Sequence, residues 1–392
     1  MPRHRSRALA SLLAASALAV SACAGPIKSQ GIGDTADHHY AIGMKLLETA
    51  GVTDAGDEFK EPGRRRPPDD LGPYTQAAAE FERARQLAPN DPRPWEGLGL
   101  VRLSRNELAS AEEAFKHSLS KNSRYVPAHL GLARVYVGVG KLDRARHEAE
   151  TAVHLAPKDP RTHVMLGRVL LSEYDFSGAE QSFSRALEIA PADAVARREW
   201  DRSVKIRQAA PGTLVGKKIA LADPVTRGEL AALLATELGV ETYVRKHRPE
   251  IGDPAFRPQG QPGSSIERPA PTDVNEHWAR NAIALVIRLD LMEPYPDGTF
   301  RPDEPMTRAA LASVLEQVLV VVSNDPSLKT RYVGQPSPFP DVRSDHFAFN
   351  AIMVTTTRGL LEAEPGSGAF GLAKPVSGPE ALLAMRKLAE LF

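Results

Sequence analysis

Eleven histidines and 49 acidic residues could bind a metal ion or transfer a proton in this 392-residue chain. A zinc-binding helix needs two histidines four positions apart, and His147-Glu148 has no second histidine at that spacing. Residues 297–303 contain the carboxylates of a calcium loop, but Arg301 stands where an oxygen ligand is required. Gly216-Lys217 lacks the glycine-rich lead-in and the following Ser or Thr of a phosphate-binding loop. The sequence therefore predicts no enzyme activity, no cofactor and no metal site.

The single cysteine, Cys23, lies where a covalent modification is expected, and it cannot form an internal disulfide. Three arginines precede an apolar run over residues 8–20, which has the length of a signal-peptide core and is too short to span a bilayer. The run ends in Val20-Ser21-Ala22-Cys23, which resembles the lipobox of bacterial lipoproteins. This resemblance implies that residues 1–22 are a cleaved signal peptide and that Cys23 carries acyl chains that hold the protein on a membrane. Ala24 after the cysteine implies the periplasmic face of the outer membrane if the source is Gram-negative.

The overall charge gives little indication of a partner. Lys plus Arg and Asp plus Glu both number 49, and removal of three signal-peptide arginines would leave 46 minus 49, or about minus three. A nearly neutral chain is not expected to bind nucleic acid through bulk electrostatics.

A period of 34 residues organises the N-terminal half. Small residues recur at 77, 111, 145 and 179, and the mostly bulky series Phe81, Phe115, Ala149 and Phe183 follows four residues later. Prolines at 89, 157 and 191 end three of the units, because proline stops a helix. The segments Trp95-x2-Leu98-Gly99 and His163-x2-Leu166-Gly167 resemble the tetratricopeptide repeat. The resemblance extends over residues 38–208 and implies a helical array, about residues 34–208, that binds protein partners.

One repeat is divided by an insertion. His39-x2-Ile42-Gly43 has the pattern of a first helix, whereas the matching second helix begins near Tyr74, so residues 49–73 are predicted to form an inserted loop. Arg64-Arg65-Arg66 in this loop could contact a polyanion. Flanking acidic residues favour a solvated loop instead. The polar segment 194–208 is predicted to be the capping helix that such arrays need.

The family places partner contacts at recurring inner positions of the first helices. In this sequence these positions are Tyr40, Met44, Glu96, Leu100, Leu130, Arg134, Val137, Val164, Arg168 and Leu171. Arg134 and Arg168 are one period apart, so we expect an amphipathic segment that carries an acidic group or a C-terminal carboxylate.

The pattern changes after Pro211. The segments Asp273-Val274, His277-Trp278-Ala279 and Tyr295-Pro-Asp-Gly-Thr-Phe300 resemble the S-layer homology module over residues 272–320. The proline and glycine suit a tight turn, and Thr307 suits the N-cap of the next helix. Residues 213–244 and 339–392 resemble degenerate copies, and residues 245–271 are predicted to be a loop or linker rich in Pro, Gly and Ser. The second domain is therefore expected to span residues 213–392.

Three such modules imply a mostly helical pseudo-threefold domain that binds cell-wall or surface polysaccharide. The resemblance implies contacts from Arg227 and Arg308, with Trp278 and Asp297 as weaker candidates. An arginine fork suits a sugar carboxylate, and an aromatic face suits a pyranose ring. The alternative, which we favour for Trp278, is a core tryptophan, with Asp297 as a turn former. Ala310 and Gly378 replace residues of the family motif, so we do not expect all three sites to bind ligand.

Together these patterns predict a mainly α fold and a non-enzymatic, lipid-anchored envelope protein that binds protein partners and polysaccharide. Two alternatives remain open. The first is an assembly factor for a pilus, a secretin or an outer-membrane complex, with a C-terminal domain that binds nothing. The second is a regulatory subunit of a wall enzyme.

Overall fold

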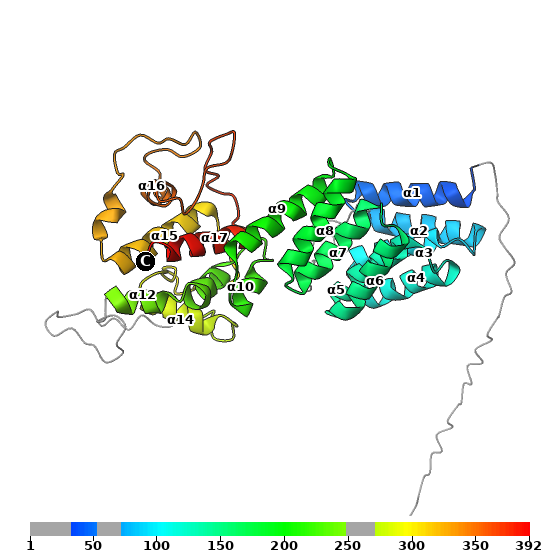
Figure 1. The fold of residues 1–392 in the computed structure, drawn as a ribbon, viewed down its shortest axis with the longest axis horizontal. Coiled ribbons are helices and arrows are strands. Elements are labelled where there is room, and N and C mark those ends of the chain that lie inside the picture. Colours follow the sequence, from blue (N-terminus) through cyan, green and yellow to red (C-terminus); the bar gives the residue numbers. More distant parts are fainter. Residues whose placement is uncertain (1–32, 53–71, 248–270) are drawn as a thin grey trace, which may run out of the picture.

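A computed structural model describes residues 33–52, 72–247 and 271–392 (Figure 1). Helices joined by turns make up these residues, and two isolated backbone bridges are the only β-type pairings among them. The predicted mainly α fold is confirmed. Cys23, the arginine cluster of the inserted loop and most of the predicted linker lie outside the described residues.

Nine helices of the described chain form the N-terminal array. Their bounds are α1 (Ala36–Thr49), α2 (Gly72–Leu87), α3 (Arg93–Ser104), α4 (Leu108–Lys121), α5 (Val126–Gly138), α6 (Leu142–Leu155), α7 (Pro160–Ser172), α8 (Phe176–Ile189) and α9 (Ala194–Ala209). Each odd-numbered helix from α1 to α7 packs against the helix that follows it. The first helix α1 packs against α2, although residues 50–71 separate them.

The recurring phenylalanines hold successive helix pairs together. Phe115 of α4 is fully buried between Gly99 of α3 and Gly131 of α5, where an added Cβ would lie 2.6 Å and 2.3 Å from its ring. Phe81 has the same relation to glycines on α1 and α3. The 34-residue ladder therefore exists because a ring can enter only where the facing helix has no side chain.

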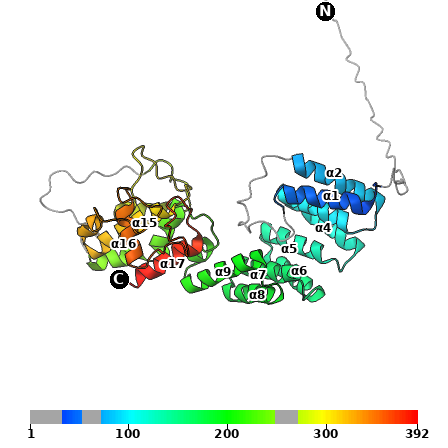
Figure 2. The same ribbon diagram turned by 90° about the horizontal axis from the view of Figure 1, so that it is seen from above.

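Helix α9 belongs to both halves of the molecule. Asp193 caps its N-terminus by accepting hydrogen bonds from the Val195 and Ala196 amides, each at 2.9 Å. It packs against α7 and α8 of the array and against α17 (Gly378–Ala389) of the C-terminal domain. Both views show α9 leading from one lobe to the other (Figures 1 and 2). One apolar cluster runs through Phe183 and Ile206 into the C-terminal domain, so α9 joins the two domains besides covering the end of the array.

The C-terminal domain contains shorter helices. Their bounds are α10 (Leu214–Ile219), α11 (Arg227–Ala232) with a π-helical continuation (Leu233–Glu237), α12 (Val240–His247), α14 (Arg280–Arg288), α15 (Arg308–Ser323), a 3-10 helix (Pro326–Thr330), α16 (Phe349–Thr357) and α17. We call the segments that end in α11–α12, α15 and α17 modules 1, 2 and 3.

A closed ring of main-chain hydrogen bonds relates the three modules. The Val225 amide donates to the Val376 carbonyl (2.8 Å), the Val376 amide donates to Met306 (2.9 Å), and the Met306 amide donates to Val225 (2.8 Å). Each of these three residues directly precedes the N-cap of a helix, which is Thr226 for α11, Thr307 for α15 and Ser377 for α17. The predicted pseudo-threefold, mostly helical domain is confirmed.

Module 1 is shortened. Residues 220–224 connect α10 to the ring, whereas residues 289–305 and 358–375 make the same connection in modules 2 and 3. The main chain of module 1 therefore lies directly against the start of α17. A Cβ at Gly378 would meet the Ile219 carbonyl oxygen at 1.9 Å and the Ala220 carbonyl carbon at 2.9 Å.

We expect Gly378→Ala to destabilise the protein by about 3 kcal/mol, because the added methyl group meets rigid main chain that must move. Urea unfolding followed by circular dichroism measures the effect. Gly33→Ala is the matched control, since its Cβ would meet no atom within 4 Å. Equal unfolding midpoints for the two variants would contradict the close approach at Gly378.

Candidate binding sites

The array has a pocket on the inner face of its first helices. The hollow is open to solvent, and its empty volume of about 470 Å³ includes part of that open solvent. Its lining comes from α3, α5, α7 and the start of α9: Glu96, Leu100, Pro127, Leu130, Gly131, Arg134, Arg161, Val164, Met165, Arg168, Asp193 and Val195. The pocket thus combines an aliphatic floor with charged side chains, a composition that suits a peptide segment.

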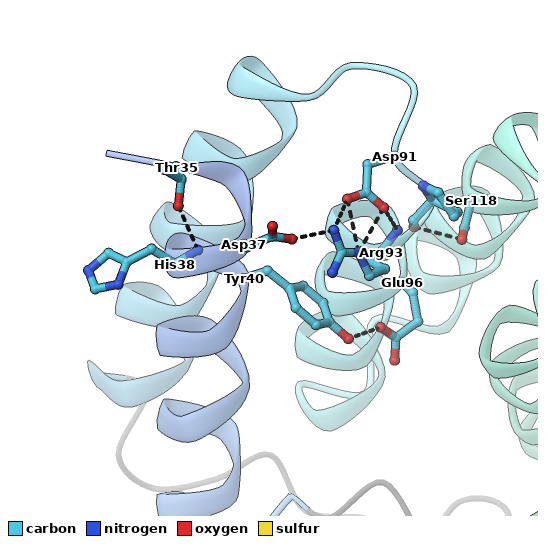
Figure 3. A network of polar contacts seen from close by, with 9 residues as sticks. Thr35, Asp37, His38, Tyr40, Asp91, Arg93, Glu96 and Ser118 are labelled. Carbon is cyan, nitrogen blue, oxygen red and sulfur yellow. Dashed lines mark hydrogen bonds and ion pairs between the residues drawn. The ribbon is translucent and has the colours of Figure 1, made fainter. Parts of the chain in front are cut away.

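A polar network fixes the end of the inner face nearest α1 (Figure 3). The Tyr40 hydroxyl of α1 donates to Glu96 of α3 at 3.1 Å, and Glu96 is 2% exposed. Arg93 of α3 donates to Asp37 of α1 at 2.6 Å and to Asp91 at 2.6 Å. Burial raises the pKa of Tyr40, so its hydroxyl stays protonated and keeps donating. This network holds α1 against α3.

Arg168 lines the pocket as predicted, but its charge is already paired within the chain. Its Nε and Nη2 donate to Glu199 Oε1 of α9 at 3.1 Å and 2.9 Å, and the two residues are 1% and 2% exposed. The chain supplies this carboxylate itself, because α9 folds over the end of the array. Arg134 is half-buried on the pocket wall, whereas Arg168 is covered and paired with Glu199.

Most of the remaining apolar inner positions are buried, and only some of them border the pocket. Leu100, Leu130 and Val164 line the pocket. Val137 and Leu171 are 2% and 1% exposed and belong to the apolar cores, which differs from the prediction of surface contacts.

Met44 is half-buried against the core of the array. Sequence reasoning missed the lining residues Met165, Arg161, Asp193 and Val195. The last two precede or begin the capping segment, where the repeat pattern has ended, so the period gave no signal for them.

The first junction, where Arg227 of module 1 meets the loop of module 2, contains an arginine held by main chain and aromatic rings. Arg227 Nε donates to the Phe300 carbonyl at 2.9 Å, and Nη2 donates to the Glu293 carbonyl at 3.1 Å. The guanidinium lies 4.7 Å from the Phe300 ring centroid and 4.8 Å from that of Tyr295. Burial lowers the pKa of Arg227, but an arginine remains charged at neutral pH.

The second junction, where Arg308 of module 2 meets the loop of module 3, repeats this arrangement. Arg308 Nε donates to the Phe370 carbonyl at 2.7 Å, Nη2 donates to the Glu362 carbonyl at 2.6 Å, and the Phe370 ring centroid lies 4.7 Å away. The two junctions differ in the pairing of the arginine, because Arg308 is 7% exposed and forms an ion pair with Glu380 of module 3.

The difference follows from one helical position that the modules share. The third residue after each N-cap is Glu229 in α11, Ala310 in α15 and Glu380 in α17. Glu380 faces Arg308, and its counterpart at the first junction is alanine. Among the described residues, no carboxylate lies within 4 Å of the guanidinium of Arg227, a half-buried residue.

The structure explains Gly378 in the same terms. An arginine at this position would need a module 1 loop to receive its guanidinium, and that loop is absent. The third junction, between modules 3 and 1, therefore has no arginine.

Trp278 is not a core residue. It is 61% exposed beside His277, and its counterpart in module 3, Phe347, is 86% exposed. The core interpretation is wrong because the helix buries Ala279, Ile283 and the following apolar residues instead. An exposed indole leaves its face available to a sugar ring.

Asp297 acts within its own turn. It accepts hydrogen bonds from the Thr299 amide (3.0 Å) and hydroxyl (2.6 Å), and it pairs with Arg301 at 2.8 Å. These donors hold the pKa of Asp297 below its usual range. Sequence reasoning missed Tyr295 and Arg301, whose guanidinium lies 4.1 Å from the Tyr295 ring centroid. Tyr295 begins the turn motif and Arg301 directly follows it, but neither is a contact residue in the family pattern.

Residues 33–52, 72–247 and 271–392 contain no group of three His, Cys, Asp or Glu side chains arranged to hold a metal ion. In the same part of the chain, no helix has both the length and the apolar character needed to cross a membrane.

These features define a helical-repeat scaffold joined to a three-module helical domain. Residues 69–125 and 130–194 match the family model of the tetratricopeptide repeat, and residues 272–312 match that of the S-layer homology domain. The chain therefore contains tetratricopeptide repeats and an S-layer homology domain. The first are typical protein-interaction scaffolds, the second indicates association with the cell envelope, and neither family is typically catalytic.

Curated relatives match parts of the chain. It is 29% identical over 143 residues to Cell surface glycoprotein 1 of Acetivibrio thermocellus and 32% identical over 119 residues to Cellulose synthase operon protein C of Xanthomonas axonopodis pv. citri. The matches cover 36% and 28% of this chain but only 5% and 8% of those proteins.

Solved structures similar to the chain include a thermophilic tetratricopeptide repeat protein from Thermus thermophilus. That match has 20% identity and a TM-score of 0.35, and it covers 51% of this chain and 90% of the other. For pilF of Pseudomonas aeruginosa the identity is 15%, the TM-score is 0.36, and the coverage is 55% and 92%.

Proposed function

We propose that the protein is a non-enzymatic envelope scaffold that holds a protein partner in its repeat array and binds an acidic surface polysaccharide at its first junction. The observation that carries this proposal is Arg227. Its side chain is half-buried, and no described carboxylate pairs with it. It lies between two aromatic rings, so a carboxylate on a sugar would gain charge-assisted hydrogen bonds from it.

Co-sedimentation tests the polysaccharide part of the proposal. The chain from residue 24 onward is mixed with purified sacculi that retain their attached polysaccharide, and with sacculi from which acid has removed it. We expect the protein to pellet with the first preparation and to stay in solution with the second. Equal pelleting with both would contradict polysaccharide recognition, and pelleting with neither would favour a C-terminal domain that only supports the array.

The pocket of the array supports the protein-binding part. Leu100, Leu130 and Val164 provide aliphatic surface, and Arg134 provides a cation on the same wall. This pairing fits an amphipathic segment with an acidic side chain or a C-terminal carboxylate. The two-arginine hypothesis drawn from the sequence is thereby reduced to Arg134, since Glu199 neutralises Arg168.

We expect Arg134→Glu to weaken partner capture by about tenfold or more, because it replaces an attractive charge in the pocket with a repulsive one. Affinity capture from an envelope extract, quantified by mass spectrometry, measures the loss. Arg144→Glu makes the same charge change at an exposed position of α6, which contributes nothing to the pocket. Proteins lost from both variants alike, or from neither, would contradict a partner site at Arg134.

The lipid anchor at Cys23 remains part of the proposal. Metabolic labelling with an alkynyl fatty acid, compared between the native chain and Cys23→Ser, tests it directly. If the anchor is present and sacculus binding is absent, the favoured alternative is an assembly factor for a pilus, a secretin or an outer-membrane complex. A regulatory subunit of a wall enzyme would instead change wall hydrolysis when it is removed.

A further inference from the structure

The second junction holds a guanidinium whose charge the chain itself neutralises. Arg227 and Arg308 make the same pair of main-chain hydrogen bonds, but only Arg308 pairs with a carboxylate. We propose that Glu380 is a built-in ligand that occupies the second junction, and that its removal creates a second binding site for acidic sugars. This inference rests on the proposed function, from which it takes the ligand class.

The helix that carries Glu380 does not use it as a cap. In α11 the equivalent Glu229 reaches back to its own N-cap, where its carboxylate accepts from the Thr226 amide at 2.8 Å and completes a capping box. In α17 the N-cap Ser377 makes no side-chain cap hydrogen bond. Glu380 leaves its own helix terminus and extends to the neighbouring module, where it pairs with Arg308.

The rest of the second junction matches the first. The Arg308 guanidinium lies over Phe370 as Arg227 lies over Phe300. Phe347 is exposed in the position of Trp278.

Asp341 accepts from the Phe370 and Gly371 amides, both at 2.7 Å, as Asp273 accepts from the Phe300 and Arg301 amides at 2.8 Å and 2.7 Å. The supporting frame of a second site is therefore built.

The other charges of the second junction would not block a ligand. Glu364, which has the place of Tyr295 at the start of the turn, already forms an ion pair with Lys374 at 2.9 Å. Asp341 is the other nearby carboxylate, and main-chain amides already donate to both of its oxygens. Without Glu380, Arg308 would therefore have no ion-pair partner among the described residues, which leaves its guanidinium to pair with the carboxylate of a ligand.

Stoichiometry of sugar binding tests the inference. Tri-galacturonate is titrated into the chain from residue 24 onward by isothermal titration calorimetry, with chitotriose as the uncharged control. We expect one site per chain in the native protein and two in Glu380→Ala. Glu380→Gln, which keeps the shape of the side chain and removes its charge, serves as a second variant against misfolding.

Two further variants locate the new site. Glu229→Ala removes the same residue type from the same helical position, but there the carboxylate caps its own helix, so we expect one site. The double variant Arg227→Ala/Glu380→Ala should retain one site, and adding Arg308→Ala should remove it.

Each outcome is decisive. One site in both the native protein and the Glu380 variants would overturn the inference and leave the proposed function standing. No binding in either would overturn both. Binding in the Glu380 variants alone would support the inference and contradict the ligand proposed for the first junction. A second site in Glu229→Ala would show that the effect does not belong to Glu380.

Discussion

Arg227→Ala should weaken binding of the acidic polysaccharide by about tenfold to a hundredfold, because a hydrogen bond to a charged group contributes roughly 1.5–3 kcal/mol. No second cation among the described residues of the first junction can replace Arg227, since Arg301 is already paired with Asp297. Quantitative co-sedimentation with sacculi over a range of polysaccharide concentrations measures the change. Arg227→Lys should recover only part of the affinity, because an ammonium cannot bind both carboxylate oxygens as a planar fork does.

Arg308→Ala is the matched control for this prediction. Arg308 makes the same main-chain hydrogen bonds to the next module, so its removal should perturb the domain to a similar or greater extent. Its charge is already taken by Glu380. We therefore expect unchanged polysaccharide binding. Equal losses in Arg227→Ala and Arg308→Ala would show that both arginines matter only for the fold.

Glu199→Ala should be the most destabilising single substitution among those considered, at about 3–5 kcal/mol, because it leaves Arg168 buried without its carboxylate. Thermal and urea unfolding measure this loss. The lesion lies between the array and the helix that joins it to the C-terminal domain. We therefore expect limited proteolysis to cut the variant near α9 before either lobe is degraded.

Two controls separate charge burial from loss of packing. The double variant Arg168→Met/Glu199→Leu removes both charges while keeping apolar volume, and we expect it to recover most of the lost stability. Glu188→Ala breaks the Arg185–Glu188 pair, whose side chains are 57% and 59% exposed, and should change stability by less than about 1 kcal/mol. A Glu199→Ala protein as stable as Glu188→Ala would contradict the role of the buried pair.

The helix pairs of the array could be predicted because their contacts repeat. Phe81, Phe115 and Phe183 each meet a glycine on a facing helix, so phenylalanine recurs at multiples of 34 residues, with Ala149 in the remaining place. Trp278 shows the limit of such reasoning. A motif position records that a residue type recurs, whereas its exposure depends on which neighbouring helices cover it.

The environment of Arg168 could not be predicted for a related reason. Its partner Glu199 is 31 residues away in a helix that does not follow the repeat pattern, so no period links the two. From the sequence, Gly378 is likewise interpreted as the loss of a ligand-binding arginine. The structure shows that glycine is needed there because module 1 is shortened and the main chain of Ile219 and Ala220 takes the space. That close approach is visible only in three dimensions.

The ring of main-chain hydrogen bonds makes the order of synthesis matter. Val225 and Val376, which bond to each other, are separated by 376 minus 225, or 151 residues. As the chain leaves the ribosome, the array can assemble from contacts between neighbouring helices. The ring closes only after module 3 has left the ribosome as well. A premature stop codon that removes α17 would therefore leave the array intact and deprive α9 and the first two modules of the partner that completes them.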